Sequence, residues 1–227
     1  MTVAGPRLQT SGEPQSCTQI TEAAMAAEAD VDTALCGGLY KCRFSPAGDT
    51  DLFNWTVPAG TVGWLKIAGP STYGSQWCLY NPSGALVECQ ANLDTTPKLI
   101  AGTHRILTRD TYNYTGDYYL SVQGISSAHR CSQPIACGDI RRGTFATKGD
   151  TDTFAFTTSA ARSIDLKITG PSTYGSKWCV FNASGDAVGA CTSGEGTLSL
   201  PSAGTYTIGV NESYNYTGAY VLSLQCL

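Results

Sequence analysis

The stretch GPSTYGSQWC at residues 69–78 recurs as GPSTYGSKWC at residues 170–179, and the only difference is that Lys177 replaces Gln76. Other segments repeat at the same spacing or one residue further on, namely GDTDLFNW (48–55) with GDTDTFAF (149–156) and YNYTGDYYLSVQ (112–123) with YNYTGAYVLSLQ (214–225). The chain therefore contains one unit twice, and each copy, of about 95 residues, is long enough to bury its own core.

Each copy has the pattern of short strands separated by turns. In SIDLKIT, residues 163–169, apolar residues alternate with polar ones, and LFNWTV at residues 52–57 alternates in the same way. A period of two predicts strands that bury one face and expose the other. The segments NPSG (81–84) and NASG (182–185) are typical of hairpin turns. Many short strands with frequent turns predict two tandem antiparallel β-sandwiches.

The segment before the first copy contains a helical pattern. Apolar residues recur there at the spacing of one helix face, at Ile20, Ala24, Ala27, Val31 and Leu35. This spacing predicts one short helix, inserted near the N-terminus at about residues 19–35. The predicted organisation is a polar N-terminal arm (1–16), a first sandwich that contains the helix (17–125) and a second sandwich (126–227).

Several segments also resemble a known family. In the second copy they are CSQPIACGDIRRGTFATKGDTDTFAF (131–156), WCVFNASGDAVGAC (178–191) and LPSAGTYTIGVNESYNYTGAYVLSLQ (200–225), and the first copy carries related segments in the same order. Together they resemble the bacterial pre-peptidase C-terminal domain. The resemblance implies an all-β, jelly-roll-like sandwich in each copy. Such domains are appended to secreted enzymes and surface proteins and serve in secretion, attachment or substrate binding, not in catalysis.

Collagen-binding relatives in that family hold Ca²⁺ with an acidic linker before the first strand. The corresponding segments here are SGEPQSC (11–17) and SSAHRC (126–131), which contain one acidic residue between them. We therefore expect no cofactor, with Ca²⁺ as the one ion to consider.

Ten cysteines without CxxC pairs predict disulfides and an oxidising compartment, and hence an extracellular or cell-surface protein. Two cysteines flank the equivalent hairpin turn in each copy, so that strand pairing should bring them together. The expected bonds there are Cys78–Cys89 and Cys179–Cys191.

The remaining cysteines are less regularly placed. Cys131 and Cys137 bracket a short loop and are expected to pair, and Cys17 and Cys36 would be the equivalent pair in the first copy.

Cys42 and Cys226 have no counterpart in the other copy. They either join each other across the domains or bond to a neighbouring chain. A redox-active or metal-binding role is the alternative.

Composition excludes two classes of protein. Charged residues make up 14% of the chain and the net charge is −4, which does not fit a nucleic-acid binder with clustered basic residues. No apolar run approaches the roughly 18 residues of a membrane span. The first residues, MTVAGPRLQT, lack the apolar core of a signal peptide. Either a leader has been removed or the chain is not secreted, and the cysteines favour the first alternative.

Asparagine occurs mainly in the N-glycosylation pattern Asn-x-Ser/Thr. Five of the seven asparagines lie in it, where chance predicts about one or two. These candidates are Asn54, Asn113, Asn182, Asn211 and Asn215. A glycoprotein would explain the excess. The alternative is that asparagine occupies β-turns beside threonine and glycine.

The sequence offers little for catalysis. It has two histidines, His104 and His129, and Tyr206 stands in the place of the first in the second copy. No nucleophile elbow or metal-ligand pattern accompanies them. We therefore expect no enzyme and no catalytic residue.

A pair of aspartates two residues apart opens an aromatic strand in each copy. These pairs are Asp49 with Asp51 and Asp150 with Asp152. Carboxylates so spaced could bind a cation. Aspartates at turns more often accept hydrogen bonds from the backbone, and we expect this structural role and no metal site.

Aromatic residues are the remaining candidates for binding. Trp77 and Trp178 share a strand face with apolar neighbours and are expected in the core. Tyrosine and tryptophan at the surface suit sugars and protein contacts, because each is an apolar ring with a polar tip. The possible binding residues are Tyr73, Tyr112, Tyr114, Tyr174, Tyr214, Tyr216 and the outward-facing Trp64. The alternative is that the hairpin tyrosines pack on neighbouring strands.

These features together predict a secreted, non-catalytic structural or adhesive protein with a self-association or cell-surface glycan partner. It could be a subunit of an extracellular fibre, in which the arm of residues 1–16 extends away from its own domain and pairs with a neighbour's sheet edge. The alternative is a carbohydrate-binding or substrate-targeting module of a larger secreted hydrolase.

Overall fold

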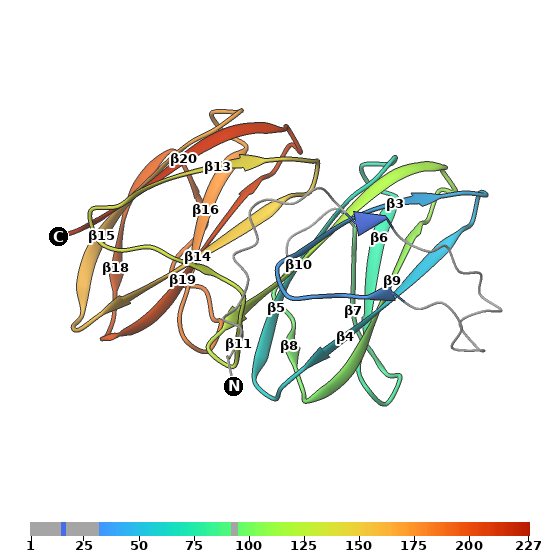
Figure 1. Ribbon diagram of the computed structural model, residues 1–227, viewed down its shortest axis with the longest axis horizontal. Helices are drawn as coiled ribbons and strands as arrows, with labels where there is room; N and C mark the ends of the chain where they lie inside the picture. Colours follow the sequence, from blue (N-terminus) through green and yellow to red (C-terminus); the bar gives the residue numbers. More distant parts are fainter. Residues whose placement is uncertain (1–14, 17–31, 92–94) are drawn as a thin grey trace, which may run out of the picture.

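The computed structural model describes residues 15–16, 32–91 and 95–227. These residues form strands and turns and contain no helix, so the fold is all-β, as predicted (Figure 1). None of the described segments forms a helix long and apolar enough to cross a membrane. The strands build two β-sandwiches that lie side by side.

The first sandwich consists of two sheets, A1 and B1. Sheet A1 has the strand order β1 (Gln15–Ser16), β3 (Gly38–Phe44), β10 (Gly116–Ser126), β5 (Thr61–Ala68) and β8 (Lys98–Leu99), and β11 (His129–Arg130) also pairs with β10. Sheet B1 has the order β2 (Asp32–Thr33), β4 (Thr50–Val57), β9 (Gly102–Asp110), β6 (Ser75–Tyr80) and β7 (Leu86–Ala91). Apart from β1–β3 and β2–β4, the neighbours pair antiparallel.

The second sandwich repeats this topology in sheets A2 and B2. Sheet A2 has the order β13 (Ile140–Phe145), β20 (Gly218–Cys226), β15 (Arg162–Thr169) and β18 (Glu195–Leu200). Sheet B2 has the order β12 (Gln133–Pro134), β14 (Thr151–Thr158), β19 (Gly204–Glu212), β16 (Ser176–Phe181) and β17 (Thr192–Ser193). Strands β3, β10 and β5 thus correspond to β13, β20 and β15.

The alternating pattern places one residue face of each strand inside its own sandwich. Trp77 and Trp178 are buried in the two cores, as predicted, together with Phe154 and Phe156 of β14. Burial of a large apolar side chain contributes roughly 1.5–3 kcal/mol, so these positions dominate the stability of each sandwich.

The two sandwiches stack as four sheets in the order B1, A1, B2, A2. Outward-facing residues of A1 pack on outward-facing residues of B2, and the apolar centre of this contact is the cluster of Val62, Trp64, Ile125, Cys179 and Phe181. Because the outer faces of A1 and B2 differ, the contact joins unlike surfaces.

Two expectations about the N-terminal region need correction. The helix predicted at about residues 19–35 does not extend to its end, because Asp32–Thr33 pair with β4 as a strand; residues 17–31 lie outside the described residues. The arm of residues 1–16 was expected to leave its own domain, but Gln15–Ser16 pair in parallel with β3. Residues 1–14 lie outside the described residues. Backbone pairing at an available sheet edge overrides the local periodicity.

The hairpin disulfides are confirmed. Cys78–Cys89 connects β6 to β7, with Cα atoms 4.0 Å apart. Cys179–Cys191 connects β16 to the segment before β17, with Cα atoms 4.3 Å apart.

The expected pairs Cys131–Cys137 and Cys17–Cys36 are wrong. Cys36 bonds to Cys131 and Cys137 bonds to Cys226, with Cα atoms 5.6 Å and 5.4 Å apart. Cys36 and Cys137 each precede the first long strand of their sandwich. Cys226 ends β20, and Cys131 follows β11, which pairs back onto the end of β10. Those strands, β3 with β10 and β13 with β20, are neighbours, so their ends lie side by side.

The expectation that Cys42 and Cys226 join each other or a neighbouring chain is wrong for Cys226, which bonds within its own sandwich. Cys42 is disulfide-bonded as well. A redox or metal role as free thiols is therefore excluded for both.

Candidate functional site

The exposed tyrosines gather in two equivalent groups. Tyrosine cluster 1 consists of Tyr73, Tyr112 and Tyr114, and tyrosine cluster 2 consists of Tyr174, Tyr214 and Tyr216. All six side chains are between 57% and 79% exposed. Each cluster combines the loop between β5 and β6, or β15 and β16, with the turn between β9 and β10, or β19 and β20. Both turns lie along the upper edge of the molecule in Figure 1.

A buried carboxylate holds cluster 1 in shape. Oδ1 of Asp110 accepts hydrogen bonds from the backbone N–H groups of Tyr112 and Tyr114, at 3.0 Å and 3.2 Å, and Oδ2 accepts one from the Ser75 hydroxyl at 2.9 Å. The N–H of Thr111 donates to the carbonyl of Gly74 at 2.8 Å, which ties the turn to the loop. The backbone under the rings is therefore fixed by the interior of the sandwich.

Cluster 2 uses a longer side chain for the same task. Oε2 of Glu212 accepts from the N–H of Tyr216 at 2.7 Å, and Oε1 accepts from the Ser172 hydroxyl at 2.6 Å. The Ser172 oxygen in turn accepts from the N–H of Gly175 at 2.7 Å. Glutamate and aspartate thus give the two copies the same loop geometry.

Asparagines in left-handed backbone orient the paired rings. Asn113 and Asn215 have φ values of 59° and 61°, a region that asparagine tolerates better than most residues. The flanking rings then stand edge to face, with centroids 6.4 Å apart for Tyr112 and Tyr114 and 6.3 Å for Tyr214 and Tyr216. The tyrosine rings consequently remain outside both cores, as expected for binding residues.

Trp64 differs from the prediction. It points out of sheet A1, as its strand position indicates, but it is only 2% exposed because sheet B2 covers it. Its ring lies 5.9 Å from that of Phe181, centroid to centroid. Gly209 supplies the space, since a Cβ atom there would collide with the indole. Trp64 is therefore part of the contact between the sandwiches and no surface binding residue.

Polar contacts frame the apolar centre between A1 and B2. Nζ of the buried Lys66 donates to the carbonyl of Glu212 at 2.8 Å, and Nε2 of Gln123 donates to the carbonyl of Thr151 at 2.9 Å. The hydroxyls of Ser121 and Thr151 also form a hydrogen bond. Because Glu212 anchors tyrosine cluster 2, this cluster is fixed relative to the first sandwich.

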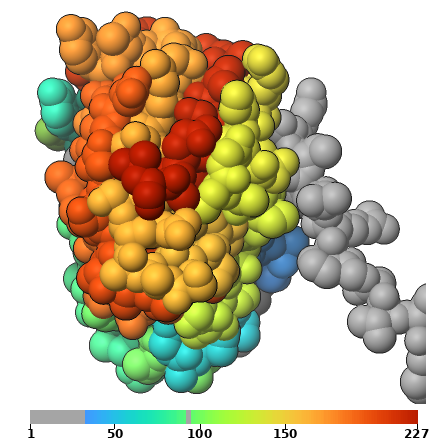
Figure 2. All heavy atoms as spheres, turned by 90° about the vertical axis from the view of Figure 1, so that its left-hand side faces the viewer, coloured from blue at the N-terminus to red at the C-terminus, as the bar shows by residue number. Residues whose placement is uncertain are grey.

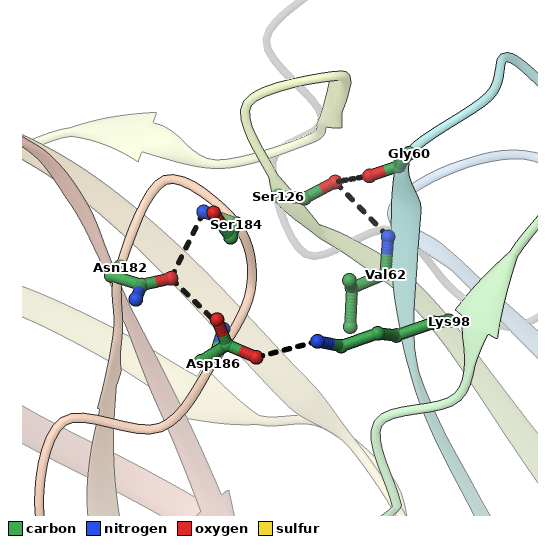
Figure 3. Close-up of polar contacts among 7 residues, drawn as sticks. All are labelled: Gly60, Val62, Lys98, Ser126, Asn182, Ser184 and Asp186. Carbon is green, nitrogen blue, oxygen red and sulfur yellow. Dashed lines mark hydrogen bonds and ion pairs between the residues drawn. The ribbon is translucent and has the colours of Figure 1, made fainter.

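A cavity of about 340 Å³ opens at the far end of the same contact. The residues around it satisfy one another (Figure 3): Lys98 pairs with Asp186 at 2.8 Å, and the Ser126 hydroxyl accepts from the N–H of Val62 and donates to the carbonyl of Gly60. Small-molecule sites span roughly 300–1,000 Å³, so this cavity is at the lower limit. Its polar groups are engaged within the protein, which favours a structural role.

The two histidines lie in the first sandwich and are withdrawn from solvent. His104 is buried in β9, opposite Trp55 of β4, and His129 is half-buried with its ring 6.5 Å from that of Trp55. Burial lowers the pKa of both imidazoles. His129 also adjoins the cysteines 36 and 131, whose sulfurs are joined in a disulfide and offer no thiolate to a metal.

The aspartate pairs turn inward. Asp49 accepts from the N–H of Ser45 at 2.8 Å and Asp150 from that of Ala146 at 2.8 Å, which confirms the predicted turn role. The second members, Asp51 and Asp152, instead accept from buried tyrosine hydroxyls, those of Tyr118 at 2.6 Å and Tyr220 at 2.7 Å. Strand alternation alone did not predict this contact, although the tyrosine recurs two residues after Thr-Gly in both copies.

Burial of these carboxyl and hydroxyl groups raises their pKa values. Burial, and then the charge of Asp152, raises the pKa of Asp150 to about 7. Burial also raises the pKa of Asp152, and burial together with the neighbouring carboxylates raises the pKa of Tyr220.

The glycosylation candidates differ in accessibility. Asn211 is only 3% exposed, so an oligosaccharide cannot be carried there in the folded protein, and that expectation is wrong. Asn54 is half-buried in β4, Asn182 and Asn215 use their side-chain oxygens to hold turns, and Asn113 is exposed. Asn113, between two tyrosines of cluster 1, is thus the most accessible acceptor.

Comparison with known proteins gives distant structural likenesses. No family model and no curated protein matches the sequence. Among solved structures, the pre-peptidase C-terminal domain of a collagenase from Bacillus anthracis is 21% identical, with a TM-score of 0.36, and the match covers 43% of this chain and 99% of that one. The periplasmic inhibitor of g-type lysozyme PliG from Aeromonas hydrophila is also 21% identical, with a TM-score of 0.36, over 42% of this chain and 96% of that one.

A third structure spans both sandwiches. The CUB1-EGF-CUB2 domains of rat MASP-1 cover 85% of this chain and 99% of their own, at 9% identity and a TM-score of 0.26. Likenesses at these values do not bear on function. Membership of both copies in the pre-peptidase C-terminal family stays a prediction from the sequence motifs.

Proposed function

We propose that the chain is an extracellular, non-catalytic structural and adhesive module that contacts carbohydrate through its two tyrosine clusters. The observation that carries this proposal is the duplication of the clusters. Each sandwich carries three exposed tyrosines, and in each a buried carboxylate at the equivalent place accepts hydrogen bonds from the backbone of the tyrosine turn. Because the backbone of these turns is already fixed, it loses little conformational entropy on binding.

The chemistry of the clusters favours neutral sugars. A tyrosine ring offers an apolar face for the C–H groups of a pyranose and a hydroxyl for its polar groups. The loops themselves, GPSTYGS (69–75) and TYNYTG (111–116), contain no charged residue. A ligand recognised mainly by charge would require other residue types.

The extracellular setting is supported by the disulfides. Between cysteines of the described residues, four bonds close within the sandwiches, and disulfides persist mainly in oxidising compartments. The resemblance to the pre-peptidase C-terminal domain, whose members serve in attachment and secretion, is in line with this setting.

The test is retention on insoluble polysaccharides. The intact chain is incubated with cellulose, chitin, β-1,3-glucan and mannan, and the bound fraction is measured after washing. We expect at least one of these polymers to retain the chain, and the variant Y112A/Y114A/Y214A/Y216A to lose retention while its melting temperature changes little. The matched control is Leu86→Ala, which removes an equally exposed apolar side chain outside the clusters.

Failure of all four polymers to retain the intact chain, or equal retention of the tyrosine variant, would overturn the proposal. The same clusters also favour the alternative of a targeting module of a larger hydrolase. That alternative predicts retention by a chain that stays monomeric at every concentration.

A further inference from the structure

Sheet A2 of the second sandwich has an edge whose counterpart in the first sandwich is covered by a strand. In sheet A1, β1 pairs in parallel with β3, at Tyr40 and Lys41. The equivalent of β3 in sheet A2 is β13, which pairs with β20 as β3 pairs with β10. Among the described residues, no strand pairs with the other side of β13. Figure 2 looks onto sheet A2, where β13, in yellow, borders the red β20.

The backbone of β13 directs hydrogen-bonding groups toward this edge. The carbonyl of Asp139 accepts from the N–H of Leu224 in β20. Because bonding alternates along an antiparallel pair, the odd-numbered residues of β13 also bond to β20, whereas the even-numbered ones do not. Ile140, Arg142 and Thr144 therefore direct their N–H and C=O groups away from β20. An edge of this kind is a template for one more strand.

The core-facing side of β13 is less completely covered than that of β3. Tyr40 and Cys42 of β3 are 2% and 5% exposed. Their equivalents in β13, Arg141 and Gly143, are half-buried. Gly143 also has no side chain, because the ring of Tyr220 occupies the space that a Cβ atom would need. Apolar side chains of an added strand would complete the cover of the core at this edge.

The outward side of β13 carries a positive charge that its counterpart neutralises. In the first sandwich, Lys41 forms an ion pair with Asp117 at 3.1 Å. In the second sandwich, Arg142 takes the place of the lysine and Ala219 takes the place of the aspartate. Arg142 is exposed, and no acidic side chain among the described residues forms an ion pair with it. The neighbouring Arg141 pairs with Asp139 at 2.9 Å, so Arg142 is the charge that a partner would meet.

We propose that the free edge of β13 binds an extended segment of a partner protein in which apolar and acidic side chains alternate. The segment adds in parallel, as β1 adds to β3, with its apolar side chains over Gly143 and its acidic ones beside Arg142. Backbone hydrogen bonds provide the affinity of such a contact, and the alternate side chains provide its selectivity. This surface recognises polypeptide, so the inference goes beyond the proposed contact with carbohydrate.

The experiment measures binding of fluorescently labelled peptides to the full chain by fluorescence anisotropy. The probe is the peptide SVEVEVS, and SVKVKVS is its counterpart with the charge reversed. A third peptide is SVEVEVS with N-methyl groups on the valines, which cannot donate backbone hydrogen bonds from these residues. We expect SVEVEVS to bind, and the other two to bind much more weakly.

A proline in β13 tests whether the backbone of the edge is used. Thr144→Pro removes an N–H that points away from the sheet, and it should weaken binding of SVEVEVS by about tenfold. The matched control is Ser199→Pro on β18, the opposite edge of sheet A2. The N–H of Ile168 donates to the carbonyl of Gly194, so Ser199 likewise directs its N–H outward. This control should bind SVEVEVS as the intact chain does.

A charge reversal tests the selectivity. Arg142→Glu should weaken binding of SVEVEVS by roughly fivefold and strengthen binding of SVKVKVS, because opposite charges on neighbouring strands attract and like charges repel. Lys148→Glu is the control, because Lys148 is exposed in the turn that follows β13 and not in the strand. It should leave the preference for SVEVEVS unchanged.

The inference is overturned if the intact chain does not bind SVEVEVS, which would mean that the arginines only protect the edge from pairing. Equal binding by Thr144→Pro, or equal binding of the N-methylated peptide, would also refute strand addition. Retention on polysaccharide is measured on the same Thr144→Pro variant and should match that of the intact chain. Failure of peptide binding and failure of the proposed carbohydrate contact are therefore distinguished.

Discussion

Asp110 and Glu212 explain why the sequence repeats a loop so closely. Each carboxylate binds the tyrosine turn on one side and a serine of the GPSTYGS segment on the other. Gly74 and Gly175 lie between these partners, where a Cβ atom would collide with the carboxylate and with a serine hydroxyl. The near identity of residues 69–78 and 170–179 therefore follows from packing around one buried acid.

Asp150 makes the stability of the second sandwich depend on pH. Burial raises its pKa to about 7 in the folded protein, above the value of 3.8 for a free aspartate. Between these values the folded protein keeps a proton that the unfolded chain has released, so the free energy of unfolding falls as the pH rises from about 4 to about 7 and levels off above.

Asp150→Asn should remove most of this fall, because the amide oxygen still accepts from Ala146 and the side chain cannot ionise. Melting temperatures at about pH 5 and about pH 8 test it: the intact chain should melt lower at the higher pH, and the variant should change less. An equal change of melting temperature in both proteins would show that burial of the Asp150 carboxyl does not control the pH dependence of stability.

At the scale of elements, one glycine in β19 decides how the sandwiches meet. Gly209 receives the ring of Trp64, whereas the equivalent residue of the first sandwich is Leu107. Gly209→Leu copies a residue that this sheet position already accommodates in the other sandwich, so the strand itself should persist. The leucine would overpack the contact, at a cost of roughly 1–3 kcal/mol.

We expect the G209L variant to retain two folded sandwiches that no longer hold each other rigidly. Small-angle scattering should report a larger radius of gyration, and calorimetry should resolve two transitions. Thr205→Leu, on the same strand and half-exposed, is the control. An unchanged scattering profile for Gly209→Leu would mean that Trp64 does not determine the packing.

Short sequence patterns predicted the features that depend on residues close together in the chain. Alternation of apolar and polar residues predicted the strands. The turns between the paired cysteines predicted Cys78–Cys89 and Cys179–Cys191, because a hairpin brings its own two strands together. The bond Cys36–Cys131 spans 95 residues and depends on β3 and β10 being neighbours, which no short pattern encodes.

Trp64 illustrates the same limit. Its strand position correctly indicated that it leaves the core of its own sandwich, but periodicity within one strand does not reveal a second sandwich on the other side. For the hairpin tyrosines the sequence left both exposure and packing on neighbouring strands open. They are exposed, because loops rich in glycine, serine and asparagine leave bulky side chains outside the core.

At the scale of the whole molecule, the four-sheet stack sets the distance between the tyrosine clusters. The contacts of Lys66 with Glu212 and of Trp64 with Phe181 hold cluster 2 in a fixed relation to the first sandwich. If both clusters bind carbohydrate as proposed, two equivalent clusters held in a fixed relation suit a ligand that repeats along its length. A polymer bound at both sites gains affinity because the second contact is intramolecular.

The central claim is tested most directly by the affinity of four proteins for the same polysaccharides, immobilised for biolayer interferometry. The proteins are the intact chain, Y112A/Y114A, Y214A/Y216A and the variant with all four changes. The account predicts that loss of either cluster weakens binding by about tenfold or more and that loss of both abolishes it. Binding by the fourfold variant as tight as that of the intact chain would contradict the account.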